Sequence, residues 1–134
     1  MLLDLADVPG ELRPAADAAL RAAGVVEGHL AVDLVPAGRI RELNREHRGR
    51  DEPTDVLSFP IDGAEGVAGP CELGDVVICP EHAADLDRAT VHGVLHLCGY
   101  DHEADDGEML ALESAVMQAL GLGDERPATS DERR

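Results

Sequence analysis

The stretch HGVLHLCGYDH, residues 92–102, contains a helix end and three histidines, and the rest of the chain is best interpreted from it. His92 and His96 are four residues apart and therefore lie on one face of a helix. Gly99 can adopt the left-handed backbone conformation that ends a helix, so the chain can reverse and bring His102 back toward the other two histidines. Three imidazole ligands with an open fourth position are typical of a catalytic zinc site. The stretch therefore predicts a metal-dependent hydrolase.

Zinc is the metal that this stretch favours, at one ion per chain, although nickel, copper or iron would also accept imidazole ligands. The spacing resembles the HExxHxxGxxH motif of metzincin proteases, in which a glutamate directly after the first histidine is the general base. Gly93 stands at that position here, which disfavours peptide hydrolysis by the same route. We expect Gly93 instead to leave space through which a substrate approaches.

The charge of the chain limits its binding partners. Its formal net charge is −17, although 44% of its residues are hydrophobic. This charge disfavours non-specific binding to nucleic acid, DNA included, and to an anionic membrane. One local cluster of basic residues runs against the overall charge, and it comprises Arg39, Arg41, Arg45, Arg48 and Arg50. The cluster is either an anion-binding surface or a solvated helix face on which arginines pair with Glu42 and Glu46.

The cysteines and the apolar segments indicate in which cellular compartment the protein is expected. Three cysteines without a CxxC spacing argue against a disulfide framework and favour a reducing cytoplasm. Cys98 comes two residues after His96 and is expected to be a small core residue. The N-terminus lacks the pattern of a signal peptide, and no apolar run approaches the length that crosses a bilayer. We expect a cytoplasmic protein that makes no membrane contact.

The hydrophobic pattern predicts a single domain over residues 1–123 in which strands and helices are mixed. Strands are expected at 1–5, 30–35, 54–60 and 73–79, and Pro60 ends the third or places it at a sheet edge. The second helix is expected to turn Ile40, Leu43 and His47 toward the core. Helices are expected at 11–23, from 36, from 80 into the histidine stretch, and from 105 with an apolar stripe of Met109, Leu112, Val116 and Leu120. Residues 62–70 are expected to form a surface loop and residues 124–134 a disordered tail.

Three stretches together resemble the YbeY family of single-strand-specific endoribonucleases. The histidine stretch is similar to the signature of that family. Two further stretches match, and together the matches cover residues 43–112 in the same order as in the family. The two further stretches are Leu43-Asn44 with Arg48-Gly49 and PTDVLSFP at 53–60, which resemble the LN…YRG…PTDVLSFP segment, and LGDVVI at 73–78, which resembles the LGDI strand. The chain departs from the family pattern at His47, which replaces the usual aromatic residue, and in the link from Cys79 to Val91, which is shorter.

The resemblance implies an α+β fold, a small mixed four-stranded sheet packed by helices, that is distantly zincin-like. It implies His92, His96 and His102 as zinc ligands and places Arg48 toward the metal cleft, where its guanidinium would bind a phosphate. His92 and Arg48 are therefore the candidate catalytic residues. The implied function is 16S rRNA 3′-end maturation and quality control of the small subunit in the 70S ribosome. The implied partners are single-stranded rRNA, the small ribosomal subunit and its assembly factors.

Several residues have weaker candidate roles. Arg45, Arg50 and Ser58 are expected to contact substrate, although a strand hydroxyl such as that of Ser58 is usually structural. Asp101 and Asp75 are expected to orient a ligand histidine. A hydrogen bond to nearby turn backbone accounts equally well for Asp101.

Two other functions stay open at this point. The first is a ribosome-assembly factor whose metal is mainly structural, with Cys71 or Cys79 as a fourth ligand. The second is a metal-dependent hydrolase of a substrate other than RNA. The residues also do not distinguish water from the RNA 2′-hydroxyl as the nucleophile.

Overall fold

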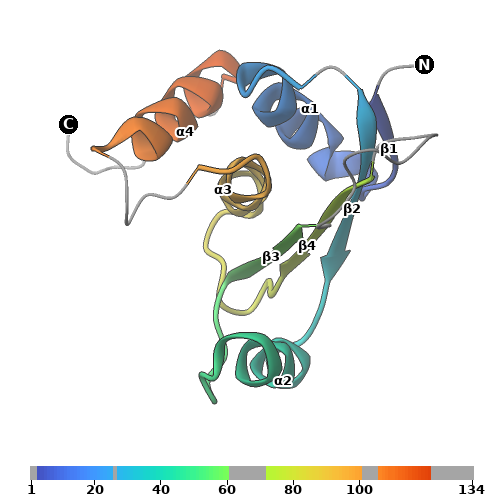
Figure 1. Cartoon of the computed structure of the whole chain (residues 1–134), viewed down its shortest axis with the longest axis vertical. Coiled ribbons are helices and arrows are strands. Elements are labelled where there is room, and N and C mark those ends of the chain that lie inside the picture. The colour runs from blue at the N-terminus through green and yellow to red at the C-terminus, as the bar shows by residue number, and fades with distance from the viewer. Residues whose placement is uncertain (1–2, 26, 61–71, 101–105, 122–134) are drawn as a thin grey trace.

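The computed structural model describes residues 3–25, 27–60, 72–100 and 106–121. Its centre is one four-stranded sheet in the order β1-β2-β4-β3 (Figure 1). The strands are β1 (Leu3–Asp7), β2 (Gly28–Leu34), β3 (Val56–Pro60) and β4 (Glu72–Ile78). β1, β2 and β4 are parallel, whereas β3 pairs with β4 in the antiparallel direction. The predicted α+β class with a small mixed sheet is confirmed.

The helices cover both faces of this sheet. They are α1 (Arg13–Ala22), which follows a short 3-10 turn at Gly10–Leu12, α2 (Ala37–Arg48), α3 (Leu86–Leu97) and α4 (Glu108–Ala119). Figure 1 shows α1, α3 and α4 together, with α2 apart from them near the other end of the sheet. Because side chains alternate across a strand, Val76 and Ile78 join the core with α1, α3 and α4, whereas Val77 joins a second core with α2.

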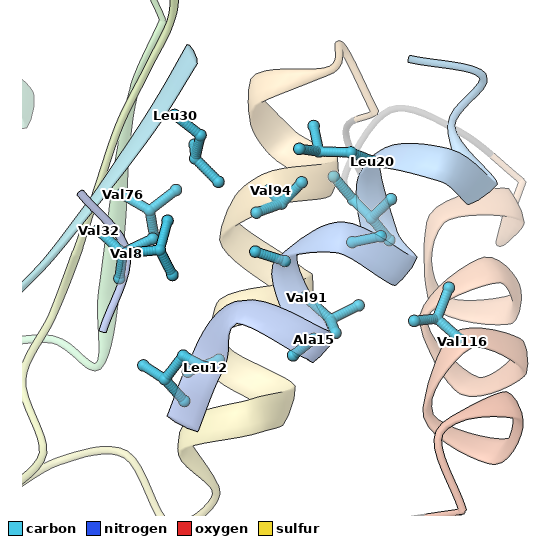
Figure 2. Close-up of a cluster of buried hydrophobic side chains, with 14 of the residues drawn as sticks. Val8, Leu12, Ala15, Leu20, Leu30, Val32, Val76, Val91, Val94 and Val116 are labelled. Atoms are coloured by element: carbon cyan, nitrogen blue, oxygen red, sulfur yellow. The ribbon is translucent and has the colours of Figure 1, made fainter. Parts of the chain in front are cut away.

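The larger core surrounds α3. Val91, Val94 and Leu95 of this helix are fully buried between the sheet, α1 and α4 (Figure 2). Leu20 of α1 and Leu30 of β2 lie in the same cluster. Nearly every side chain in this cluster is aliphatic, as a sequence with one Phe and one Tyr requires. Burial of this apolar area is the main favourable contribution to folding, and it fixes α3 in the middle of the molecule.

Gly93 brings α3 unusually close to the sheet. A Cβ atom at this position would lie 2.6 Å from Cγ1 of Val76 and 3.0 Å from Cγ2 of Val56. The expectation that Gly93 leaves space for a substrate is therefore wrong, because β3 and β4 occupy that space. Because glycine has no side chain, α3 can pack directly against β3 and β4 at this position.

Most predicted elements are present with shifted ends. The first strand is Leu3–Asp7, β3 begins at Val56, and α3 begins at Leu86 rather than at 80. Asp85 caps α3 by accepting a hydrogen bond from the Arg88 backbone N–H at 3.1 Å, as helix N-caps commonly do. β3 is an edge strand, which suits Pro60. The predicted loop at 62–70 and the predicted tail at 124–134 lie outside the described residues.

The inward face of α2 differs from the prediction at one position. Ile40 is fully buried and Leu43 is half-buried, but His47 is exposed. Asn44 is buried in its place, and its side-chain amide donates to the Glu52 carbonyl at 2.8 Å. This bond ties the helix to the turn that follows it.

No helix in the described part of the chain is long and apolar enough to cross a membrane.

Gly93→Ala is expected to lower the free energy of unfolding by about 1–3 kcal/mol, because the added methyl group overlaps Val76 and forces α3 away from the sheet. Urea denaturation measures the change. Gly38→Ala is the matched control, since Gly38 is an exposed residue of α2 whose Cβ would contact nothing within 4 Å. Alanine there is expected to raise stability by about 0.5–1 kcal/mol. Equal stability of the two variants would contradict the close approach of α3.

Candidate metal centre

Helix α3 places His92 and His96 side by side. Their ring centroids are 4.8 Å apart and the ring planes are inclined by 75°, as the four-residue spacing predicts. Both rings are half-buried. The helix ends where expected, with Gly99 in a backbone conformation of φ 100°. The third predicted ligand, His102, lies outside the described residues, and the residues within them contain no group of three metal-binding side chains.

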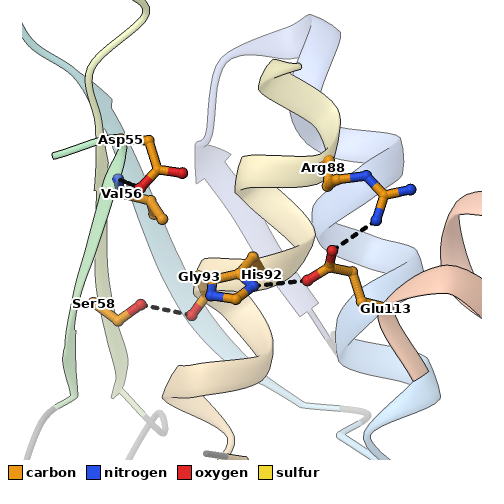
Figure 3. Close-up of polar contacts among 7 residues, drawn as sticks. All are labelled: Asp55, Val56, Ser58, Arg88, His92, Gly93 and Glu113. Carbon is orange, nitrogen blue, oxygen red and sulfur yellow. Dashed lines mark hydrogen bonds and ion pairs between the residues drawn. The ribbon is translucent and has the colours of Figure 1, made fainter. Parts of the chain in front are cut away.

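A buried carboxylate from α4 contacts His92. Glu113 is 5% exposed, and its Oε1 lies 2.7 Å from Nδ1 of His92. Its other oxygen, Oε2, accepts a hydrogen bond from Nη1 of Arg88 at 2.7 Å. Figure 3 shows the carboxylate between the two α3 side chains. His92, Arg88 and Glu113 therefore form one connected polar group between α3 and α4.

The electrostatics of this group favour a charged glutamate. Burial raises the pKa of the Glu113 carboxyl, but the hydrogen bonds from His92 and Arg88 and their charges lower it by more. The pKa therefore lies below the usual value for a glutamate, and the carboxylate is ionised at neutral pH. A buried ion of this kind persists only where its partners satisfy both oxygens.

Sequence reasoning missed both Arg88 and Glu113. A signal for Glu113 was present, because it comes four residues after Met109 and three before Val116, within the predicted apolar stripe of the last helix. A charged residue at such a position needs a buried partner. Arg88 comes four residues before His92 and therefore lies one turn away on the same side of α3.

A pocket of about 260 Å³ opens beside His92. Ala83, Ala84 and Ala89 supply its apolar wall, and its polar lining comes from Asp55, Asp85, Arg88, His92 and Glu113. Asp55 directly precedes β3, and its side chain accepts a hydrogen bond from the Val56 backbone N–H at 2.8 Å (Figure 3). The pocket brings the residue before β3 together with α3, the segment before α3, and α4.

Ser58 connects β3 to the helix that carries the histidines. Its hydroxyl donates to the Gly93 carbonyl at 2.7 Å (Figure 3). Asp75, a candidate for orienting a histidine, is exposed on β4 opposite Phe59 of β3. Asp101, the other candidate, lies outside the described residues.

The arginine cluster was expected to be either an anion-binding surface or a helix face of paired arginines, and its members differ in this respect. Arg39 pairs with Glu42 at 3.2 Å, and Arg41 donates to Asp51 at 2.7 Å. Hydrogen bonding to Arg41 lowers the pKa of Asp51. The flanking residues make looser pairs, Arg45 with Asp51 at 4.0 Å and Arg50 with Glu52 at 3.9 Å.

Arg48 differs from these arginines. It is exposed at the end of α2 and makes no hydrogen bond or ion pair with any residue that the structure describes. The neighbouring His47, which departs from the family pattern, still makes a ring contact, because its centroid lies 4.7 Å from that of Phe59. Arg48 is therefore free to bind an external anion.

The two cysteines within the described residues contribute to the cores. Cys79 is fully buried in the second core with Ile40, Leu57 and Val77. Cys98 is half-buried, and burial raises the pKa of its thiol, which favours the neutral form over the thiolate that binds metals. Cys71 lies outside the described residues.

Comparison with known proteins identifies the family. The family model for Endoribonuclease YbeY matches residues 12–121. The chain belongs to the YbeY family. The matched range contains Arg48, the three histidines of the predicted site and Glu113.

Two proteins named Endoribonuclease YbeY, from Anaeromyxobacter sp. (strain Fw109-5) and Anaeromyxobacter dehalogenans, are 46% and 45% identical to this chain. Each alignment covers 83% of this chain and 64% of the relative. A third, from Alkalilimnicola ehrlichii, is 46% identical over 71% of this chain and 66% of its own length. The chain thus spans less than two thirds of these relatives. The solution structure of TM1509 from Thermotoga maritima aligns over 97% of this chain and 100% of its own, with 28% identity and a TM-score of 0.49.

Ser58→Ala is expected to lower the free energy of unfolding by about 0.5–1.5 kcal/mol, because it removes the hydrogen bond that joins β3 to α3. Thermal or urea denaturation measures this. Ser114→Ala is the control, since Ser114 is also half-buried but has no hydrogen bond to a described side chain or loop. If both variants have the same stability, Ser58 does not hold the helix to the strand.

Proposed function

We propose that this YbeY-family chain is a zinc-dependent endoribonuclease of single-stranded rRNA. Its proposed role is 16S rRNA 3′-end maturation and quality control of the small subunit in the 70S ribosome, in the cytoplasm. The small subunit and its assembly factors are the proposed partners. The facing rings of His92 and His96, within a range that matches the YbeY family, are the observation that carries the proposal.

His92, His96 and His102 are the residues that would hold the zinc ion. The donor set fits zinc because imidazole nitrogens are among its preferred ligands. The two described rings come from one helix face, and Nδ1 of His92 contacts Glu113, so Nε2 is the His92 nitrogen that would bind the metal. A bound zinc ion would supply Lewis acidity, which polarises a phosphoryl group and activates water at neutral pH.

Arg48 is the proposed phosphate-binding residue. Its guanidinium is exposed at the end of α2, uses none of its donors on other described residues, and stays charged at physiological pH. A guanidinium binds phosphate through two parallel hydrogen bonds, which positions as well as attracts it. Arg45 and Arg50 flank this residue and would contact neighbouring phosphates of the same strand.

The overall charge opposes tight binding of free RNA. The chain carries −17, and most arginines of the cluster are already paired with acids. Favourable contacts with phosphate therefore come from a small surface, and binding to the ribosome would supply the remaining affinity. We expect weak and salt-sensitive binding to an isolated strand.

His92→Ala is expected to abolish cleavage of a single-stranded fragment from the 16S rRNA 3′ end, because it removes a metal ligand. Arg48→Ala is expected to lower kcat/KM by about 10- to 100-fold, since it removes a charge-assisted hydrogen bond to phosphate. Gel analysis of the RNA fragments measures both, with and without a chelator. Arg21→Ala is the control, because Arg21 is an exposed arginine of α1 paired with Asp17. Cleavage that survives His92→Ala or the chelator would contradict the proposal.

The affinity for single-stranded RNA is expected to fall steeply with ionic strength. In a plot of log Kd against log salt concentration, Arg48→Ala should reduce the slope by about 0.7, the value for one phosphate contact on a single strand. Fluorescence anisotropy at several salt concentrations measures the slope. Arg21→Ala should leave it unchanged, and tight binding that does not respond to salt would rule out a phosphate-binding surface.

A further inference from the structure

The buried carboxylate of Glu113 lies between two donors from one helix. Both contacts are 2.7 Å long, one to Nδ1 of His92 and one to Nη1 of Arg88. We propose that Glu113 is a positioning residue for His92, which fixes the tautomer and the orientation of this imidazole for metal binding. This inference rests on the proposed zinc site.

The tautomer follows from the chemistry of the contact. A carboxylate only accepts hydrogen bonds, so Nδ1 of His92 must be the donor in the 2.7 Å contact. Arg88 supplies a charged donor to the second oxygen, so Glu113 needs no proton of its own to satisfy that atom. In a neutral imidazole whose proton is on Nδ1, the lone pair is on Nε2. Glu113 therefore presents the form of His92 that can bind a metal through Nε2.

The orientation follows from how firmly Glu113 itself is held. Its backbone belongs to α4, where Met109 and Met117 on the same side are fully buried. Its second oxygen is anchored by Arg88, one turn before His92 on α3. Rotation of the His92 ring about its Cβ–Cγ bond would break the contact and leave a buried carboxylate oxygen without a donor, which is costly. The ring is therefore fixed before any metal arrives.

A purely structural role for this group is a weaker explanation. An ion pair buried between helices contributes little net stability, because desolvation offsets the attraction, and apolar side chains of the same volume often serve as well. The surrounding core of α1, α3 and α4 is aliphatic. Helix contact alone therefore does not account for a carboxylate here, whereas carboxylates that orient metal-binding histidines are common.

Glu113→Gln tests the inference because it keeps the shape of the side chain and replaces one acceptor oxygen with an NH2 donor. Since Arg88 can only donate, the amide oxygen is expected to face Arg88 and the NH2 to face His92. The amide can donate to Nδ1, which favours the tautomer with the proton on Nε2. Long-range proton–nitrogen NMR correlation on the metal-free protein reports the His92 tautomer. We expect Nδ1–H in the unchanged protein and a shift toward Nε2–H in the variant. Competition with a chelator should show zinc Kd raised about 10- to 100-fold.

Glu108→Gln is the matched control. It makes the same substitution on the same helix, at an exposed residue whose Oε1 accepts only from the Asp106 backbone N–H among described residues. Both the tautomer and the zinc Kd should stay as in the unchanged protein. An Nδ1–H tautomer retained in Glu113→Gln, with a zinc Kd equal to that of the control, would overturn the proposal.

Arg88→Gln keeps the test available if Glu113→Gln does not fold, because Arg88 is partly exposed and easier to replace. It loosens Glu113 without removing the contact to His92, so the zinc Kd should rise while the Nδ1–H tautomer is kept. An unchanged zinc Kd would count against positioning. If the unchanged protein binds no zinc, the proposed metal site fails, whereas the tautomer measured without metal still decides the role of Glu113.

Discussion

The close contact between α3 and the sheet at Gly93 is the constraint on which the rest of the structure depends. α3 carries His92, His96 and Arg88, and its position is set on one side by Val76 and Val56 and on the other by α1 and α4. A larger residue at 93 would move the helix outward, and His92, His96 and Arg88 with it. The hydroxyl of Ser58 reinforces this contact from the edge strand. The geometry of the proposed site therefore depends on the distance between α3 and the sheet.

The site combines an apolar and a charged environment around one helix. One side of α3 is fully buried among aliphatic side chains, and another holds Arg88 and His92, which contact Glu113 of α4 beside a pocket. The low polarity of the core strengthens each hydrogen bond in the group and makes an unpaired member costly. This arrangement restrains the His92 ring more firmly than a surface contact would. Arg48, on a different helix, has the opposite character, since it is exposed and makes no ion pair with a residue in the described ranges.

Local features were predictable from the sequence where a short-range rule applied. The i,i+4 spacing of His92 and His96, the helix end at Gly99 and the edge position of β3 all follow from such rules, and the structure confirms them. Contacts between elements that are distant in the sequence were not predictable in this way. His47 and Asn44 differ by three positions on α2, and the buried Asn44 amide is satisfied by a contact with the Glu52 carbonyl that the helical pattern does not reveal. Gly93 was misread because helical periodicity does not say which neighbour a bare position faces. Glu113 was missed because its partner lies twenty-one residues away on another helix.

X-ray absorption at the zinc edge of the zinc-loaded protein tests the central claim most directly. The claim is that His92 and His96 of α3, together with His102, bind one zinc ion per chain and that no cysteine completes the site. The account predicts nitrogen and oxygen scatterers at about 2.0–2.1 Å with the multiple-scattering signature of imidazole. A sulfur scatterer at about 2.3 Å, or a protein that retains no zinc, would contradict it.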